Sequence, residues 1–115
     1  MTHVLIVDDN QDLAENIAEI LTLKGFTTHI ATSAEDALPQ ALPDGPGIVV
    51  TDYRLPGMSG AELVRQIRQA RQTVRAVVIS AYTDDGTISA ARNAGADFLP
   101  KPVDFAALSR LLDVA

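Results

Sequence analysis

Short apolar runs rich in β-branched residues, each ending in a polar side chain, constrain this fold most. Residues 3–7 (HVLIV) run directly into Asp8 and Asp9, and residues 48–51 (IVVT) run directly into Asp52. Runs of this length and composition are typical of strands that are buried on both faces, as in a parallel sheet. Because parallel strands bring their C-terminal ends to one edge of the sheet, we expect these carboxylates to converge.

Carboxylates that converge in this way repel one another, so the fold has to offset the repulsion with a cation or with protonation. Oxygen ligands that leave several coordination positions open suit Mg²⁺, which keeps part of its water shell in proteins. The aspartates at this sheet edge therefore predict a magnesium site.

Two further strand-like runs end in side chains that would complete such a site. Residues 74–79 lead into Ser80, and residues 97–100 lead into Lys101, one of only two lysines in the chain. A carboxylate nucleophile, a divalent cation, a hydroxyl and a fixed ammonium group are the parts that a phosphoryl acceptor needs. The sequence therefore indicates a site that accepts a phosphoryl group.

Helical spacing of apolar residues alternates with these runs along the whole chain. The expected helices begin near Asn10, Ser33, Ser59, Asp84 and Asp104. Ser33 with Asp36, and Ser59 with Glu62, resemble capping boxes. The alternation predicts one α/β domain over residues 1–115, with five helices on a parallel sheet. Ligands in such folds bind beyond the carboxyl ends of the strands, where the polar residues above fall.

Three segments carry local expectations. Residues 26–31 are a mixed, less apolar run, expected to be a strand near an edge of the sheet. Pro39 lacks an N–H and would clash with a carbonyl one turn earlier, so the second helix is expected to be short, kinked or to stop near Leu38. Residues 84–93 have few large apolar side chains, and this helix is expected to be the least firmly packed.

Composition and charge exclude several classes of function. The chain has no cysteine, so it has neither a disulfide framework nor a thiolate metal site. No apolar run approaches the roughly 20 residues of a transmembrane helix, and no signal-peptide pattern is present, so a cytoplasmic domain away from membranes is expected. The net charge of −6 argues against direct nucleic-acid binding. A cluster of arginines is expected to be a solvated helix face: Arg65, Arg68, Arg71 and Arg75.

Taken in order, the motifs resemble the receiver domain of bacterial two-component response regulators. The resemblance covers essentially all 115 residues. It rests on the pair Asp8-Asp9, the segment 52–60 (DYRLPGMSG), Ser80-Ala81 and Lys101-Pro102. It implies a flavodoxin-like fold, with five parallel strands in the order 2-1-3-4-5 and helices on both faces. It also implies a signalling domain that catalyses only its own phosphorylation and dephosphorylation, rather than an enzyme with a separate substrate.

The resemblance assigns roles to the residues of the site. Asp52 would be the phosphoacceptor, and the donor would be a sensor histidine kinase or a histidine phosphotransfer protein. Asp9, Asp52 and the backbone carbonyl of Arg54 would bind Mg²⁺, or Mn²⁺ in its place, and Asp8 would act through water. Lys101 would pair with the phosphoryl oxygens.

The resemblance further implies a conformational switch. Ser80 would hydrogen-bond the phosphoryl group and move inward, and Phe98 would fill the space that Ser80 and its loop vacate. The surface formed by the helix 84–93, the strand 97–100 and the last helix would then control a downstream effector or output domain, or join two copies in a homodimer.

Two side chains are expected to control how fast the phosphoryl group is lost. Arg54 lies two residues after Asp52, and Tyr82 lies two residues after Ser80, at the same predicted sheet edge. Bulky side chains at these positions would occupy the approach of a water in line with the phosphorus–oxygen bond.

Other functions fit the residues less well. A phosphatase of the haloacid dehalogenase type would need a second aspartate where Arg54 stands. A receiver-shaped module that is never phosphorylated would have no need for the complete acidic set and Lys101. The P-loop pattern of nucleotide-binding proteins is absent.

Several residues also have ordinary structural explanations. Asp8 and Asn10 could cap a helix, Asp52 could belong to a turn, and Lys101 could be an exposed lysine. The burial habits of aromatic residues favour a core position for Phe98. His3 and His29 show no partner pattern for a metal or acid–base site and are read as structural. Tyr53 and Tyr82 are expected either to line the mouth of the site or to be surface residues.

Overall fold

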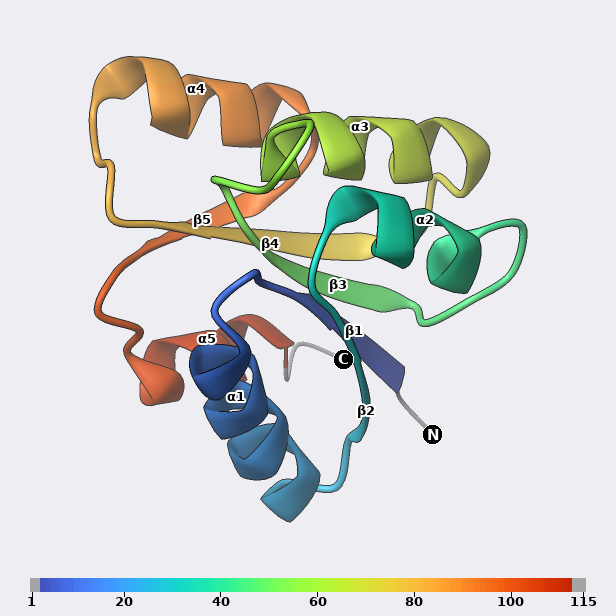
Figure 1. Cartoon of the computed structure of the whole chain (residues 1–115). Coiled ribbons are helices and arrows are strands. Elements are labelled where there is room, and N and C mark those ends of the chain that lie inside the picture. Colours follow the sequence, from blue (N-terminus) through green and yellow to red (C-terminus); the bar gives the residue numbers. More distant parts are fainter. Residues whose placement is uncertain (1–2, 113–115) are drawn as a thin grey trace.

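The computed structural model describes residues 3–112, which contain one five-stranded parallel sheet (Figure 1). The strands lie side by side in the order β2-β1-β3-β4-β5. Their bounds are β1 His3–Val7, β2 Thr27–Ala31, β3 Ile48–Asp52, β4 Arg75–Ser80 and β5 Asp97–Pro100. This is the flavodoxin-like strand order, so the expected fold class is confirmed.

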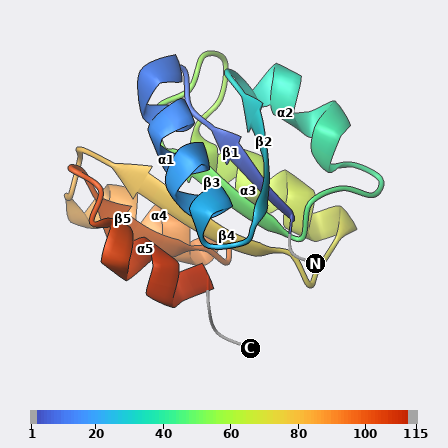
Figure 2. The ribbon, with the colours of Figure 1, turned by 90° about the horizontal axis from the view of Figure 1, so that it is seen from below.

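Within the described part of the chain, five helices cover both faces of the sheet (Figures 1 and 2). Their bounds are α1 Gln11–Leu23, α2 Ala34–Ala41, α3 Gly60–Ala70, α4 Asp85–Asn93 and α5 Phe105–Leu112. Helices α1 and α5 pack on one face, and α2, α3 and α4 pack on the other. None of these helices is both long and apolar enough to cross a membrane.

The central strands are apolar throughout because both of their faces are covered. In β1, Leu5 and Val7 join the core beneath α2 and α3, whereas Val4 and Ile6 join the core beneath α1 and α5. All residues of β3 are buried. Strand β2 lies at an edge of the sheet and is only partly buried, which confirms the expectation from its mixed composition.

Polar side chains fix where the first four helices begin. In each case the side chain of the residue before the helix accepts a hydrogen bond from the backbone N–H three residues later. These capping residues are Asn10, Ser33, Ser59 and Asp84. The predicted capping boxes are only half formed, because the carboxylate of Glu62 accepts from Arg65 and Gln66, and that of Asp36 accepts from the backbone of Thr32.

Helix α2 continues past Pro39, so the expectation that it stops near Leu38 is wrong. It is short, as predicted, but runs to Ala41 with Pro39 inside it. Pro39 lies on the exposed side, and Glu35, whose carbonyl loses its intrahelical partner, is exposed as well. Burial of Ala34, Ala37 and Ala41 on the opposite side keeps the helix in place.

The arginine cluster is mostly structural, so the prediction of a solvated helix face is wrong for most of it. Arg71 donates to the carbonyl oxygens of Ala41, Gly45 and Pro46 at 2.9–3.0 Å. The remaining members divide between backbone and side-chain partners: Arg68 donates to the carbonyl of Val74, Arg75 to that of Leu111, and Arg65 pairs with Glu62 at the surface. Arg68 and Arg71, at the end of α3, thus fasten the segments before β3 and β4, and Arg75, the first residue of β4, joins that strand to α5.

Helix α4 buries only small side chains, as its sequence predicts. Its buried residues are Thr87 and Ala91, whereas α3 buries Leu63, Val64 and Ile67 besides two small residues. Burial of apolar surface stabilises an element in rough proportion to its area. We therefore expect movement of α4 to cost less free energy than movement of the other helices.

Candidate functional site

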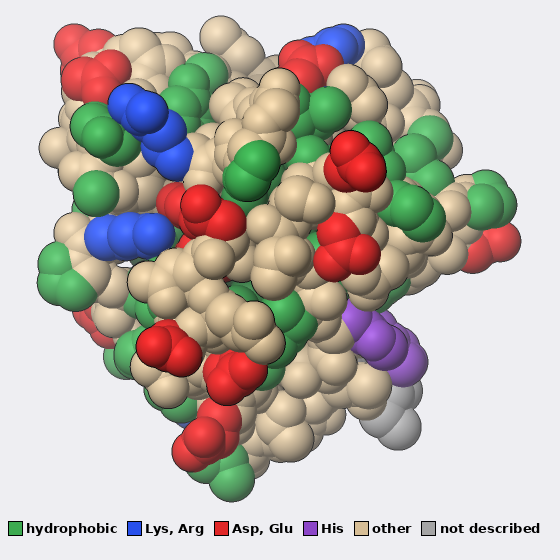
Figure 3. Space-filling view, in the orientation of Figure 1, with side chains coloured by type: hydrophobic (Ala, Val, Ile, Leu, Met, Phe, Trp, Pro, Cys, Tyr) green, Lys and Arg blue, Asp and Glu red, His purple; other side chains and the backbone are tan. Residues whose placement is uncertain are grey.

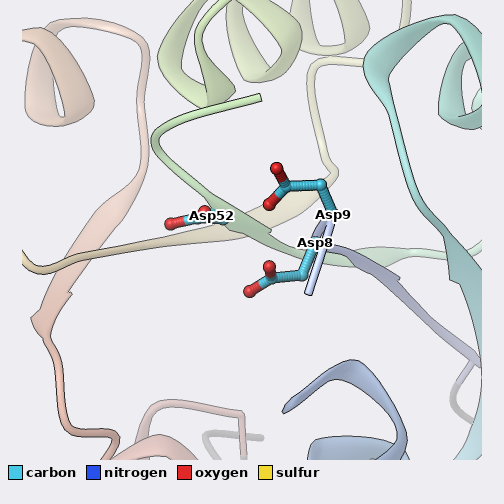
Figure 4. Close-up of side chains that lie close together, drawn as sticks. All are labelled: Asp8, Asp9 and Asp52. Carbon is cyan, nitrogen blue, oxygen red and sulfur yellow. The ribbon is translucent and has the colours of Figure 1, made fainter. Parts of the chain in front are cut away.

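The carboxylates of Asp8, Asp9 and Asp52 meet beyond the C-terminal ends of β1 and β3. The two strands are neighbours in the sheet, with Val7 paired to Thr51. Carboxylate oxygens of the three aspartates all lie within 4.8 Å of one another, and the side chains extend toward the same space (Figure 4). The predicted convergence is therefore present.

Backbone hydrogen bonds hold two of these aspartates in place. The N–H of Asp8 donates to the carbonyl of Ala31 at 3.1 Å, which continues the β1–β2 ladder past the last residue of β1. The Asp8 carboxylate accepts from the N–H of Asn10 at 2.9 Å. The hydroxyl of Thr51 donates to the carbonyl of Asp52 at 2.9 Å.

Gly60 lets the first turn of α3 pack directly against Asp52. A Cβ atom at this position would lie 2.1 Å from the backbone oxygen of Asp52, which is impossible without a shift of one backbone. Gly60 is a site residue that was not predicted from the sequence. The available signal was a glycine at the first position of a helix, where its low helix propensity is otherwise a cost.

Lys101 supplies the positive charge, as the sequence predicts. Its Nζ atom lies 3.3 Å from Oδ1 of Asp52 and 3.7 Å from Oδ2 of Asp8. The Lys101 N–H donates to the carbonyl of Ser80 at 2.8 Å, which fixes the lysine to the end of β4. The Lys101–Pro102 peptide bond is cis.

The electrostatic balance of the site favours a divalent cation. Asp8 and Asp52 are buried, and this loss of solvation raises the pKa of each carboxyl, although Lys101 lowers the pKa of Asp52 in part. When all three aspartates are ionised, one ammonium group leaves two negative charges uncompensated. Closely spaced oxygen donors with this excess charge fit Mg²⁺.

Ser80 ends β4 beside this cluster and is buried. Its Oγ atom accepts a hydrogen bond from the N–H of Tyr82 at 2.9 Å. The side chain is therefore engaged with its own loop in this structure as an acceptor, and its O–H can still donate to the phosphoryl group that the sequence predicts as its partner.

Arg54 and Tyr82 contact each other at the surface. The guanidinium carbon of Arg54 lies 4.5 Å from the centroid of the Tyr82 ring, a cation–π arrangement. The stacking of the two side chains was not predicted from their spacing in the sequence. An isolated antiparallel β-bridge pairs Arg54 with Ser59 and closes the loop between these two residues. The roles of Arg54 in water access and, through its carbonyl, in metal binding remain predictions.

Phe98 is a partly buried residue of β5. It packs with Tyr53 and Ala94 against the small cluster that Val64, Val78 and Ala91 help to form beneath α3 and α4. This placement agrees with a core position and leaves the predicted switching role as a prediction.

The fold and the site together define a receiver-like signalling domain: a flavodoxin-like sheet with an acidic cluster and a lysine at its carboxyl edge. The family model "Response regulator receiver domain" matches residues 4–113, and the chain belongs to this family. It is thus the receiver domain of a two-component response regulator.

Curated relatives support this assignment over nearly the whole chain. A response regulator receiver protein of Anaeromyxobacter is 44% identical over 115 residues, which is 99% of this chain and 47% of the relative. The transcriptional regulatory protein FixJ of Rhizobium meliloti is 37% identical over 102 residues, which is 88% of this chain and 50% of FixJ. The chain thus spans about half the length of these relatives.

Solved structures agree with the fold. A CheY-like receiver domain protein from Methanospirillum hungatei has a TM-score of 0.92 at 26% identity, covering 98% of this chain and 91% of its own. A response regulator from Burkholderia pseudomallei, with a phosphorylated aspartic acid and a calcium ion, has a TM-score of 0.87 at 26% identity. The match covers 96% of this chain and 66% of the chain of that protein.

Asp8→Asn is expected to stabilise the protein in the presence of a chelator and to weaken its response to Mg²⁺. A raised carboxyl pKa means that the folded state binds the proton more tightly than the unfolded state. Ionisation of Asp8 therefore lowers the free energy of unfolding at pH values above the raised native pKa. This loss of stability disappears as the pH falls toward about 3.9, the ordinary pKa of an aspartate in the unfolded chain. The variant lacks this ionisation, and its amide oxygen can still accept from Asn10.

In chelator at pH 7, the melting temperature of the variant should be a few degrees above that of wild type. This corresponds to an increase on the order of 1 kcal/mol in the free energy of unfolding. The difference should shrink as the pH is lowered. Millimolar Mg²⁺ should raise the melting temperature of wild type by preferential binding to the native state and raise that of the variant less. A wild-type melting temperature indifferent to Mg²⁺ would contradict a metal site here.

Proposed function

We propose that this domain takes a phosphoryl group from a phosphohistidine onto Asp52 in a Mg²⁺-dependent reaction. The observation that carries the proposal is the placement of the Asp52 carboxylate: buried, within 4.8 Å of two further aspartates and 3.3 Å from an ammonium group. A carboxylate oxygen of Asp52 forms the new bond to phosphorus, and the phosphorus–nitrogen bond breaks. The histidine nitrogen leaves with the electron pair and then takes up a proton.

The other residues stabilise the transferred group. Asp9, Asp52 and the Arg54 carbonyl would hold Mg²⁺, with Asp8 acting through water. The cation supplies charge neutralisation at the phosphoryl oxygens when it is bound. Lys101 reaches the same space from the end of β5, and its ammonium group offsets the charge that Asp52 gains on phosphorylation.

Ser80 and Phe98 are proposed to convert phosphorylation into a change of shape. The Ser80 O–H donates to a phosphoryl oxygen as the side chain moves inward, and the β4–α4 loop, which Ser80 Oγ joins by accepting from the Tyr82 N–H, follows. Phe98 repacks against the small side chains beneath α4, which hold that helix weakly. This movement favours a different conformation of the surface formed by α4, β5 and α5.

We infer partners of the kind that such a switch requires. The phosphoryl donor is a sensor histidine kinase or a histidine phosphotransfer protein in the cytoplasm. The altered surface then acts on an effector or output domain, or on a second copy of this chain. Direct nucleic-acid binding by the domain itself is disfavoured by its net charge of −6. Beyond its own phosphorylation and dephosphorylation, no separate catalytic activity is proposed.

Incubation with phosphoramidate tests this function, because its phosphorus–nitrogen bond resembles that of phosphohistidine. Intact-mass measurement should show one phosphoryl group per chain with Mg²⁺ and almost none with excess chelator. A receiver-shaped module that is never phosphorylated would stay at its original mass under both conditions, and this result would overturn the proposal.

Removing either member of the Arg54–Tyr82 stack is expected to shorten the lifetime of the phosphoryl group. The stack is proposed to cover the approach of the hydrolytic water, and loss of one side chain frees the other. Arg54→Ala and Tyr82→Ala should each speed hydrolysis by up to about tenfold, equivalent to about 1.4 kcal/mol of barrier. The double variant should be little faster than either single variant, because the two side chains act as a unit.

The decay of the phosphorylated mass with time measures this effect, with Arg65→Ala as the control. Arg65 is an exposed arginine paired with Glu62 on α3, outside the stack. Half-lives that are unchanged or longer in both stack variants would show that these side chains do not restrict water.

A further inference from the structure

The histidines form an exposed pair on the neighbouring strands β1 and β2. His3 begins β1, and His29 lies in the neighbouring edge strand β2. The register pairs His3 with Thr27 and Leu5 with His29, so the histidines are diagonal neighbours on the same face of the sheet. Their side chains lie together at the molecular surface (purple in Figure 3).

The ring nitrogens of this pair face each other. Nδ1 of His3 lies 3.3 Å from Nε2 of His29, whereas the ring centroids are 5.6 Å apart with an angle of 16° between the planes. The short nitrogen separation shows that the rings meet edge to edge, with one N–H directed at the lone pair of the other ring. Both rings are held on paired strands, which limits how far they can separate.

Two imidazole nitrogens at this separation match the bite of a transition metal. With metal–nitrogen bonds of about 2.0–2.1 Å, two ligands on a tetrahedral ion lie about 3.3 Å apart, and on a square-planar ion about 2.9 Å. The facing directions of the two nitrogens now lie along the line between them, so each exposed ring must turn by about 35–45° to aim its lone pair at a common metal position. The ring that now donates its facing N–H must carry that proton on its distal nitrogen instead, so a neutral pair needs no net proton release.

We propose that His3 and His29 form a bidentate site for Cu²⁺, Ni²⁺ or Zn²⁺. Imidazole nitrogen prefers these borderline ions, and Mg²⁺ prefers oxygen, so the pair and the acidic cluster select different metals. Among the residues that the structure describes, the acidic cluster is the only place where three or more metal-ligating side chains converge. The histidine site therefore leaves coordination positions open to water.

The site is independent of the phosphorylation site. His3 is separated from Asp8 by the length of β1, about 16 Å at roughly 3.3 Å per residue of extended chain, and His29, which is in register with Leu5, lies about 10 Å of strand before the level of Asp8. A metal here would join the edge strand β2 to its only neighbour in the sheet, β1. The expected consequence is tighter pairing of this edge, with no effect on the chemistry at Asp52.

Titration with Ni²⁺ tests the site, on protein without a polyhistidine tag and with millimolar Mg²⁺ present to occupy the acidic cluster. Calorimetry should show one Ni²⁺ site in wild type. His3→Gln and His29→Gln should each weaken it at least tenfold, about 1.4 kcal/mol. Thr73→Gln, an exposed substitution in the loop before β4, should leave it unchanged.

Cu²⁺ provides a second measurement, because its paramagnetism broadens NMR signals near the bound ion. Broadening should be centred on His3, His29 and Leu5 and should disappear in either histidine variant, while circular dichroism shows that both variants fold. The proposal is overturned if wild type binds no Ni²⁺, if binding survives in His29→Gln, or if broadening centres on Asp9 instead.

Discussion

Asp52→Asn is expected to take up no phosphoryl group from phosphoramidate, with or without Mg²⁺. Asparagine has nearly the same shape, but its amide does not attack phosphorus as a carboxylate does. The substitution also removes one of the two carboxylates that lie within 4 Å of Lys101. Because the pKa of Asp52 is raised by burial, the neutral side chain should be tolerated by the fold.

The control for this prediction is Asp44→Asn. Asp44 is exposed in the loop between α2 and β3, at the opposite end of β3 from Asp52, and its loss should leave phosphoryl uptake at the wild-type level. Intact mass and a melting curve for both variants separate loss of the acceptor from loss of the fold. Full uptake by Asp52→Asn would show that another residue is the acceptor.

Gly60→Ala is expected to damage both stability and phosphorylation, although alanine favours helices over glycine. The new Cβ would lie 2.1 Å from the backbone oxygen of Asp52 and 3.0 Å from Oγ1 of Thr51, so α3 and the end of β3 must move apart. Forced overpacking of this kind costs about 3 kcal/mol, or roughly 10 °C in melting temperature. Displacement of Asp52 should slow phosphoryl uptake in the fraction that remains folded.

Gly47→Ala provides the matched control, since a Cβ atom there meets nothing within 4 Å. Its melting temperature and rate of phosphoryl uptake should stay close to those of wild type. If Gly60→Ala behaved like Gly47→Ala in both measurements, the close packing of α3 on Asp52 would not matter to the site.

The strands and their polar ends could be predicted because their signals are local. Runs such as 48–51 are apolar at every position, which is typical of central parallel strands, and the next residue then falls at the carboxyl edge. Asp8, Asp9, Asp52, Ser80 and Lys101 all occupy that edge as expected. Helix starts were equally local, because one side chain caps each of the first four helices.

The remaining features depend on contacts between segments that are distant in sequence. The bonds from Arg71 to the end of α2 and to the α2–β3 loop join residues 25–30 positions apart. The spacing of the arginines in the sequence is the same as that of a solvated helix face. The path of α2 past Pro39 depends on which side of the helix faces solvent. The contact between Gly60 and Asp52, and the pairing of His3 with His29, likewise appear only when the strands are placed in register.

The position of the phosphoryl group in the wild-type protein tests the central claim most directly. After incubation with phosphoramidate and Mg²⁺, borohydride reduction converts an aspartyl phosphate to homoserine, and peptide mass spectrometry locates the converted residue. The proposed function predicts homoserine at position 52 alone, at a yield that follows the phosphorylated mass and falls to background with chelator. Conversion at Asp8 or Asp9 in place of Asp52, or phosphorylation with no homoserine at position 52, would contradict it.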